Sequence, residues 1–151
     1  MLRLWGVVLA SNLAGTYLFS LAIAHINVLE PAAQQALTTI ALGHLGASFG
    51  IVVVRAIFAG WLLALMVWLL PGAESARVGI IIIITYLIGI GGFNHVVAGS
   101  TVMFFLVIGH TISWGTYLTQ FFVPTLLGNV IGGLSLVTAL NHAQVVGGKE
   151  N

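Results

Sequence analysis

The side chains most able to do chemistry lie in one short segment, Gly89-Ile-Gly-Gly-Phe-Asn-His95, inside a long apolar stretch. Ionisable groups at membrane depth are costly, and they are candidate functional groups by default. An imidazole titrates near neutral pH, so His95 could donate a hydrogen bond or a proton to a small anion. The alternative is a neutral ring that pairs with a neighbouring helix for structural reasons. The residues alone weigh these two alternatives equally.

Three glycines precede His95 in that segment and weaken helix formation there. The apolar run that contains them, about residues 78–108, is too long for one ordinary membrane span. Irregular backbone at membrane depth is tolerated only where it is buried in protein or lines a watery cavity. We therefore expect a half-helix over Val78–Gly92, a break at Phe93–His95 and a second half-helix over Val96–Ile108. In transporters, broken helices of this kind present backbone N–H and C=O groups to solutes.

A second polar candidate is Asn129, which lies between Gly128 and Gly132 in another apolar stretch. Glycines at this spacing allow membrane helices to pack closely. The Asn129 amide could therefore bond a neighbouring helix, or it could line a solute path. The sequence does not rank these two alternatives.

The other ionisable residues indicate no catalytic or metal site. Arg55 lies near a helix end, where an arginine usually extends its charge to the lipid headgroups, although it could also guide anions to a pore mouth. No cysteine is present, and no histidine–glutamate cluster has the spacing of metal ligands. We therefore expect no cofactor, no metal and no enzymatic activity. We expect the remaining histidines to lie near the membrane surfaces with solvated rings; they are His25, His44, His110 and His142.

Composition indicates the solvent that surrounds these residues. Of the 151 residues, 60% are hydrophobic and 5% are charged, whereas soluble domains carry roughly 25% charged residues. Lipid must therefore surround most of the surface, and the expected fold is all-α, with several transmembrane helices. A net charge of +1 offers no basic patch for nucleic acid.

Four stretches are long enough to cross a bilayer as helices. The first is favoured as a retained helix over a signal peptide, because its apolar region of about 20 residues exceeds the usual length. Between the first two spans, a surface or partly embedded helix is expected around residues 32–37, and residues 110–121 suit the outer membrane interface. All four spans belong to one membrane domain, residues 1–151, and they are expected at residues 4–24, 51–70, 78–108 (broken near 93–95) and 122–140.

Basic residues set the expected orientation of these spans. With four spans, Arg3, Arg77 and Lys149 fall on one side of the membrane, and only Arg55 falls on the other. Because basic residues collect on the cytoplasmic side, we expect both termini to be cytoplasmic.

Three blocks of the sequence resemble the formate/nitrite transporter family. Arg55-Ala-Ile-Phe-Ala-Gly-Trp-Leu-Leu-Ala-Leu-Met-Val-Trp68 resembles the fourth span of the family, and Gly92-Phe-Asn-His-Val-Val-Ala98 resembles its broken fifth span. Pro124-Thr-Leu-Leu-Gly-Asn-Val-Ile-Gly-Gly133 resembles the opening of the sixth span. Leu2–Ala24 would then correspond to the third.

The resemblance implies an aquaporin-like subunit with its own pore, assembled as a homopentamer in the inner membrane of a bacterium. His95 would be the central pore histidine, which protonates or hydrogen-bonds a monovalent anion such as formate or nitrite. Asn94 and Phe93 would lie with it in the broken span. Asn129 would be the sixth-span asparagine that family members place beside that histidine. The expected partners are lipid, a small anion and further copies of the subunit.

Two candidate pore positions depart from the family's formate channels. This chain has Gly60 where those channels have an asparagine in the fourth span, and Ile88 where they commonly place an aromatic constriction residue. Gly99 and Ser100 stand in place of their asparagine and methionine. These departures indicate a divergent branch of the family.

The first two spans of the family have no counterpart in these residues. The chain is therefore expected to represent the last four of six spans, either as a fragment or as a natural remnant. The leading hypothesis is a channel or transporter subunit for small monovalent anions. The alternative is a non-conducting membrane protein that keeps the fold for assembly or packing.

Overall fold

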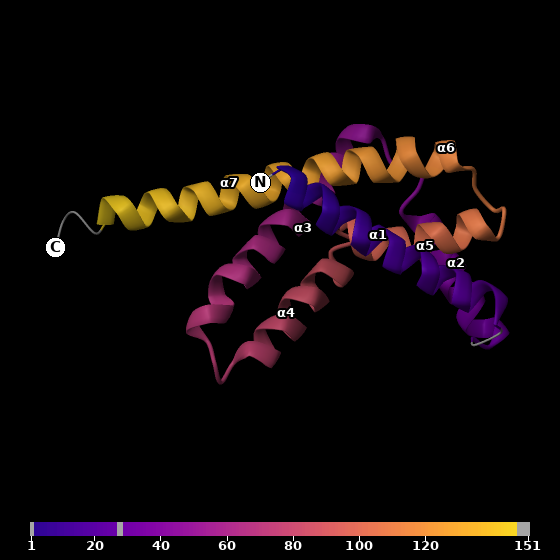
Figure 1. Ribbon diagram of the computed structural model, residues 1–151, viewed down its shortest axis with the longest axis horizontal. Coiled ribbons are helices and arrows are strands. Elements are labelled where there is room, and N and C mark those ends of the chain that lie inside the picture. The colour runs from indigo at the N-terminus through magenta and orange to yellow at the C-terminus, as the bar shows by residue number, and fades with distance from the viewer. Residues whose placement is uncertain (1, 27–28, 148–151) are drawn as a thin grey trace. The chain divides into compact units, whose positions relative to one another are not determined.

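A computed structural model describes residues 2–26 and 29–147, and every regular element in these ranges is helical (Figure 1). The prediction of an all-α fold is therefore confirmed. In chain order the elements are α1 (Leu2–His25), α2 (Pro31–Gly43), α3 (Phe49–Leu69), η1 (Leu70–Gly72), α4 (Arg77–Ile90), α5 (Val96–Ile108), α6 (Trp114–Thr116), the π-helix η2 (Tyr117–Phe122) and α7 (Val123–Gly147).

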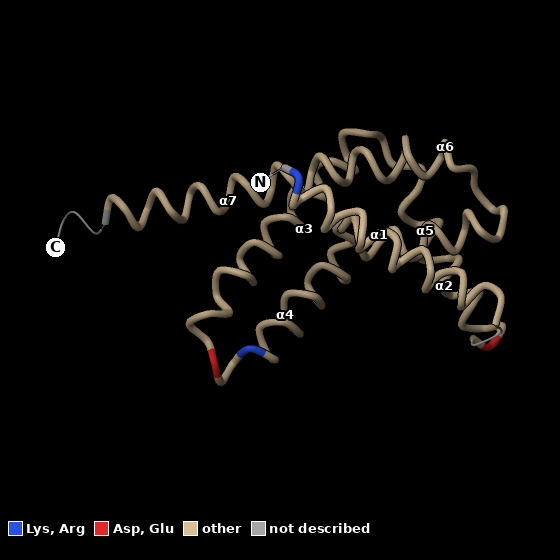
Figure 2. The backbone as a smooth tube through the Cα atoms, viewed as in Figure 1, with Lys and Arg blue, Asp and Glu red and all other residues tan. Residues whose placement is uncertain are grey.

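Three helical stretches are long and apolar enough to cross a membrane: Arg3–His25, Phe49–Gly72 and Trp114–Val146. The two shorter apolar helices, α4 and α5, each fall below the roughly 20 residues that one span needs. Figure 2 shows how few Lys, Arg, Asp and Glu residues the backbone carries. The chain is an integral membrane protein made of apolar helices, as its composition predicts.

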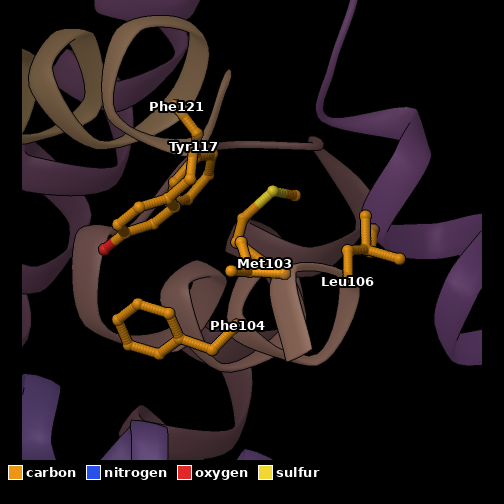
Figure 3. Packing of buried hydrophobic residues seen from close by; sticks show 7 residues of the cluster. Met103, Phe104, Leu106, Tyr117 and Phe121 are labelled. Atoms are coloured by element: carbon orange, nitrogen blue, oxygen red, sulfur yellow. The ribbon is translucent and has the colours of Figure 1, made fainter. Parts of the chain in front are cut away.

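The chain divides into two compact units, and the first comprises Met1–Ser48 and Val96–Val123. Its core forms around α5, which packs against α1, α2 and η2. Figure 3 shows the aromatic part of this core, where Phe104 of α5 lies near Tyr117 of η2 with 4.9 Å between the ring centroids. The buried members of the cluster are Ala41, Met103, Phe104, Leu106, Val107, Tyr117 and Phe121.

Polar bonds fix the helices of this first unit at two places. The buried hydroxyl of Ser20 on α1 donates to the Thr101 carbonyl of α5 at 2.7 Å. The hydroxyls of Ser100 and Tyr117 bond at 2.9 Å inside the core. Each bond joins two different helices, so these polar contacts fix the positions of the helices more specifically than apolar packing alone would.

The second unit comprises Phe49–His95 and Pro124–Asn151. In this unit α3 and α4 run side by side as a helical hairpin (Figure 1). The turn begins with the 3₁₀ helix η1, which directly follows Leu69, the last residue of α3, and contains Pro71. The Arg77 guanidinium donates to the Leu70 carbonyl at 3.3 Å, which ties the start of α4 to the end of α3.

The segment around residues 31–43 forms a longer helix than the sequence analysis expects. Pro31 occupies the first turn of α2, where its missing N–H costs nothing, and Ala41 near the other end is fully buried. His44 follows this helix, and its ring lies 6.0 Å from that of Phe121, so it is half-buried against an aromatic ring. The expectation of a simply solvated His44 is wrong for this reason.

The last helical stretch starts earlier than the expected residue 122. Every residue from Trp114 to Gly147 is helical, and residues 117–122 form the π-helix η2, directly before Pro124. A proline inside an α-helix removes one hydrogen bond and clashes with the carbonyl four residues earlier. Pro124 therefore lies inside a longer helical stretch and does not mark its start. Lys149, one of the residues behind the expected orientation, lies outside the described residues.

Candidate functional site

Helix α4 ends in a Schellman motif built on Gly92. The Phe93 N–H donates to the Ile88 carbonyl at 3.0 Å, and the Gly92 N–H donates to the Gly89 carbonyl at 3.2 Å. Gly92 has φ +60°, a left-handed conformation that glycine adopts without a Cβ penalty. Because α5 does not begin until Val96, the helix is interrupted at residues 91–95. The expected break at Phe93–His95 lies inside this interruption, and α4 ends at Ile90, two residues before the expected Gly92.

The aromatic ring of Phe93 folds back over the end of α4. A Cβ at Gly91 would lie 2.5 Å from the Cε2 atom of that ring, so the ring occupies the space of the missing side chain. On its other side Phe93 stacks on Phe58 of α3, with 5.3 Å between centroids and 26° between planes. Phe58 meets Trp61 edge-on at 5.4 Å. These contacts anchor the break to α3.

The side chain of Asn129 joins three segments of the second unit. Its Nδ2 atom donates to the Ala56 carbonyl of α3 at 2.9 Å and to the Asn94 carbonyl of the break at 2.9 Å. Asn129 itself belongs to α7. The sequence analysis left open whether this amide bonds another helix or lines a path. The structure assigns both of its N–H groups to interhelical bonds.

Helices α3 and α7 approach each other backbone to backbone along a row of small residues. A Cβ at Gly60 would lie 2.6 Å from the Asn129 carbonyl oxygen, and a Cβ at Gly132 would overlap the Ile57 carbonyl. A Cβ at Gly128 would meet Val53 and Ala56 in the same way. Residue numbers rise together along both helices, so α3 and α7 are parallel.

A third polar tie lies farther along the same pair of helices. The indole N–H of Trp61 donates to the Ser135 hydroxyl at 2.8 Å, and this hydroxyl donates to the Gly132 carbonyl at 3.1 Å. Together with the two Asn129 bonds, these contacts hold α3 and α7 in one register.

The structure brings most of the predicted site residues into one region. Asn94 is 1% exposed, and His95 directly after it is half-buried, beside the N-terminus of α5. Gly60, Asn129 and Asn94 meet through the contacts given above, and Ile88 contributes its carbonyl to the end of α4. Proximity between the His95 ring and Asn129 remains a prediction. In the described ranges, no three His, Cys, Asp or Glu side chains gather as a metal site.

Two contributors to this site were missed by the sequence analysis. Ala56 supplies a backbone carbonyl, and Trp61 supplies an indole donor, both on α3. Ala56 and Gly60 are small residues four positions apart, the spacing of close helix contacts in membranes. That spacing was visible in the sequence, whereas the identity of the facing helix was not.

The long apolar helices and the glycine-lined packing of α3 against α7 define an integral membrane protein. A sequence model of the formate/nitrite transporter family matches residues 1–143. The chain belongs to this family, which confirms the resemblance found in its three sequence blocks.

Individual relatives agree with this assignment. The chain is 34% identical over 145 residues to the inner membrane protein YfdC of Escherichia coli strain K12, covering 96% of this chain and 47% of that protein. It is 36% identical over 138 residues to the uncharacterized transporter YrhG of Bacillus subtilis strain 168, covering 88% and 51%. The formate channel BtFdhC of Bacillus thuringiensis is 32% identical over 137 residues, covering 88% and 52%.

The chain spans about half the length of the curated relatives it matches. A comparison with solved structures gave no significant match.

Proposed function

We propose that the chain forms part of a channel or transporter for small monovalent anions such as formate or nitrite. The observation that carries the proposal is the interrupted backbone at residues 91–95, which places His95 at the N-terminus of an apolar helix. The aligned peptide dipoles of a helix give its N-terminus a partial positive charge, which favours an anion. An imidazole at the same point can donate a hydrogen bond or lend a proton.

In this proposal a weak-acid anion reaches the break and accepts a hydrogen bond from His95. Moving a bare charge through an apolar region is costly, so a proton shared with the anion lowers the cost of passage. Uptake should therefore increase as the pH falls across the range in which imidazole gains a proton. Membership of the family and the similarity to the formate channel of B. thuringiensis support formate as the first anion to test.

The wider assembly is part of the same proposal. The chain corresponds to four of six spans of a family subunit, with both termini cytoplasmic, and the subunits form a homopentamer in the inner membrane. Residues 78–108 then act as one span made of two half-helices, since neither α4 nor α5 is long enough alone.

The test is uptake of labelled formate and nitrite into vesicles that contain the chain, measured from about pH 5 to 8, where histidine titrates. His95→Phe keeps ring bulk and removes both ring nitrogens, and it should abolish uptake or remove its pH dependence. His25→Phe is the matched control, because His25 is exposed at the end of α1. Unchanged pH-dependent uptake in His95→Phe would refute the role of His95. A folded wild-type chain without uptake would favour a non-conducting membrane protein.

A further inference from the structure

The two amide protons of Asn129 are both bonded within the protein. The acceptors are the carbonyls of Ala56 and Asn94, each 2.9 Å from Nδ2. A backbone carbonyl can only accept, so the NH₂ side of the amide must face these two groups. The other polar atom of the amide, Oδ1, is an acceptor and would repel an anion. Asn129 is thus poorly suited to bind the anion itself.

We propose that Asn129 is a positioning residue that clamps the peptide group between Asn94 and His95 against α3. The peptide unit is planar, so a bond to the Asn94 carbonyl also fixes the N–H and Cα of His95. The second bond of the same NH₂ group fixes the amide relative to Ala56. Asn129 therefore determines how His95 is presented, without contact with the solute.

The absence of a side chain at position 60 makes this clamp possible. The Cβ of any other residue there would lie 2.6 Å from the Asn129 carbonyl oxygen and 3.1 Å from its Cα. Backbone atoms cannot rotate away as side chains can, so α7 would have to move from α3. Gly128 and Gly132 impose the same closeness on either side of Asn129. The clamp therefore requires both Gly60, which allows the close approach of α7, and Asn129, which donates the two hydrogen bonds.

An anion ligand and a positioning residue predict different results. Loss of a ligand should change the preference between formate and nitrite, while the helices stay in place. Loss of the clamp should release the break from α3 and α7, lower the maximum rate and alter the pH profile, because His95 is presented differently. The preference between the two anions should then stay constant.

The experiment measures the position of α4 relative to α7 together with transport. The chain contains no cysteine, so spin labels can be placed at Tyr86→Cys and Leu134→Cys, two exposed sites of the second unit. Asn129→Leu removes both donors at similar volume. Asn12→Leu is the matched control, because the exposed Asn12 amide bonds only the Val8 carbonyl of its own helix, as far as described residues show.

In Asn129→Leu we expect the distance distribution between the labels to shift or broaden. We expect the maximum uptake rate to fall about tenfold to a hundredfold, the effect of leaving buried carbonyls without a donor. Asn12→Leu should change neither quantity. An unchanged label distance in a folded Asn129→Leu chain would overturn the clamp. A changed distance with unchanged uptake would overturn its role in presenting His95.

The label distances test the clamp without any assumption about transport. Only the uptake measurement rests on the proposed function. A wild-type chain that moves no anion would refute the proposed function, and the label distances would still decide whether the clamp exists. If Asn129→Leu does not fold, Asn129→Ser serves instead, since its short hydroxyl has one proton and cannot hold both carbonyls. It should shift the label distance in the same way, and wild-type distances in Asn129→Ser would contradict the clamp.

Discussion

Gly60 on α3 and Asn129 on α7 touch through their backbones, so closely that a Cβ at position 60 would lie 2.6 Å from the Asn129 carbonyl oxygen. The resemblance to the family implies an asparagine in its formate channels at the position of Gly60. In this chain such a side chain has no room while α7 lies where it does. The departure from the family pattern is therefore tied to helix packing, and it removes one polar group from the region of the break.

Replacing Gly60 by alanine should destabilise the chain. Forcing a methyl group against backbone atoms costs about 1–3 kcal/mol. Gly79→Ala is the control, because a Cβ at Gly79 meets nothing within 4 Å, and alanine is better in a helix by about 0.5–1 kcal/mol. Thermal unfolding in detergent, followed by circular dichroism, should show a lower midpoint for Gly60→Ala only. Equal midpoints in both variants would contradict the close contact.

The glycines of the break should differ in their tolerance of alanine. Gly92 has φ +60°, where an L-residue costs roughly 1–2 kcal/mol, so Gly92→Ala should lower the unfolding midpoint. Gly89 lies within α4 with nothing within 4 Å of a Cβ, so Gly89→Ala should be neutral or stabilising. The same thermal unfolding assay compares them. If Gly89→Ala proved the more harmful change, the Schellman motif would not be what ends α4.

His110→Gly should stabilise the chain. His110 follows the end of α5 with φ +55°, and the Thr111 N–H donates to the Leu106 carbonyl at 2.9 Å, so the histidine holds a position that favours glycine. Relief of the left-handed strain, less the added freedom of the unfolded chain, leaves a gain of about 0.5–1 kcal/mol. His25→Gly, at the helical end of α1, should destabilise instead. A lower unfolding midpoint for His110→Gly would argue against this cap.

The buried bond between Ser100 and Tyr117 should show coupling in a double-mutant cycle. Tyr117→Phe leaves the Ser100 hydroxyl without this partner at a cost of about 1–3 kcal/mol, and Ser100→Ala has the converse effect. The double variant should cost less than the sum of the single changes, because no buried group is left half-satisfied. Unfolding free energies of the four chains measure the coupling. Strict additivity would mean that the bond contributes nothing to stability.

Both chain ends should lie on the cytoplasmic side of the membrane. The basic residues favour this orientation, and the parallel course of α3 and α7 requires their C-terminal ends to emerge on one side. Reporter fusions at Leu70 and at Asn151 should therefore both read inside, and a fusion near Gln35 should read outside. An inside result near Gln35 would overturn the topology.

The sequence by itself determined the membrane environment, the family and the place of the break. Each of these depends on local composition or on a short motif. A run of apolar residues must lie in lipid whatever its neighbours are, and Gly92 can adopt a positive φ that ends a helix before any tertiary contact forms.

Only the tertiary structure decided what Asn129, Gly60 and Pro124 do. The Asn129 amide reaches carbonyls 73 and 35 positions away in the chain, and no local pattern names such partners. Gly60 matters because of the backbone that faces it, whereas Gly79 in α4 faces nothing within 4 Å. Pro124 favours a helix start by its local preference, yet residues 114–122 before it are helical, and the rings of Tyr117 and Phe121 there are buried. A local rule cannot foresee this, because the residues that bury those rings, such as Ala41 and Met103, lie elsewhere in the chain.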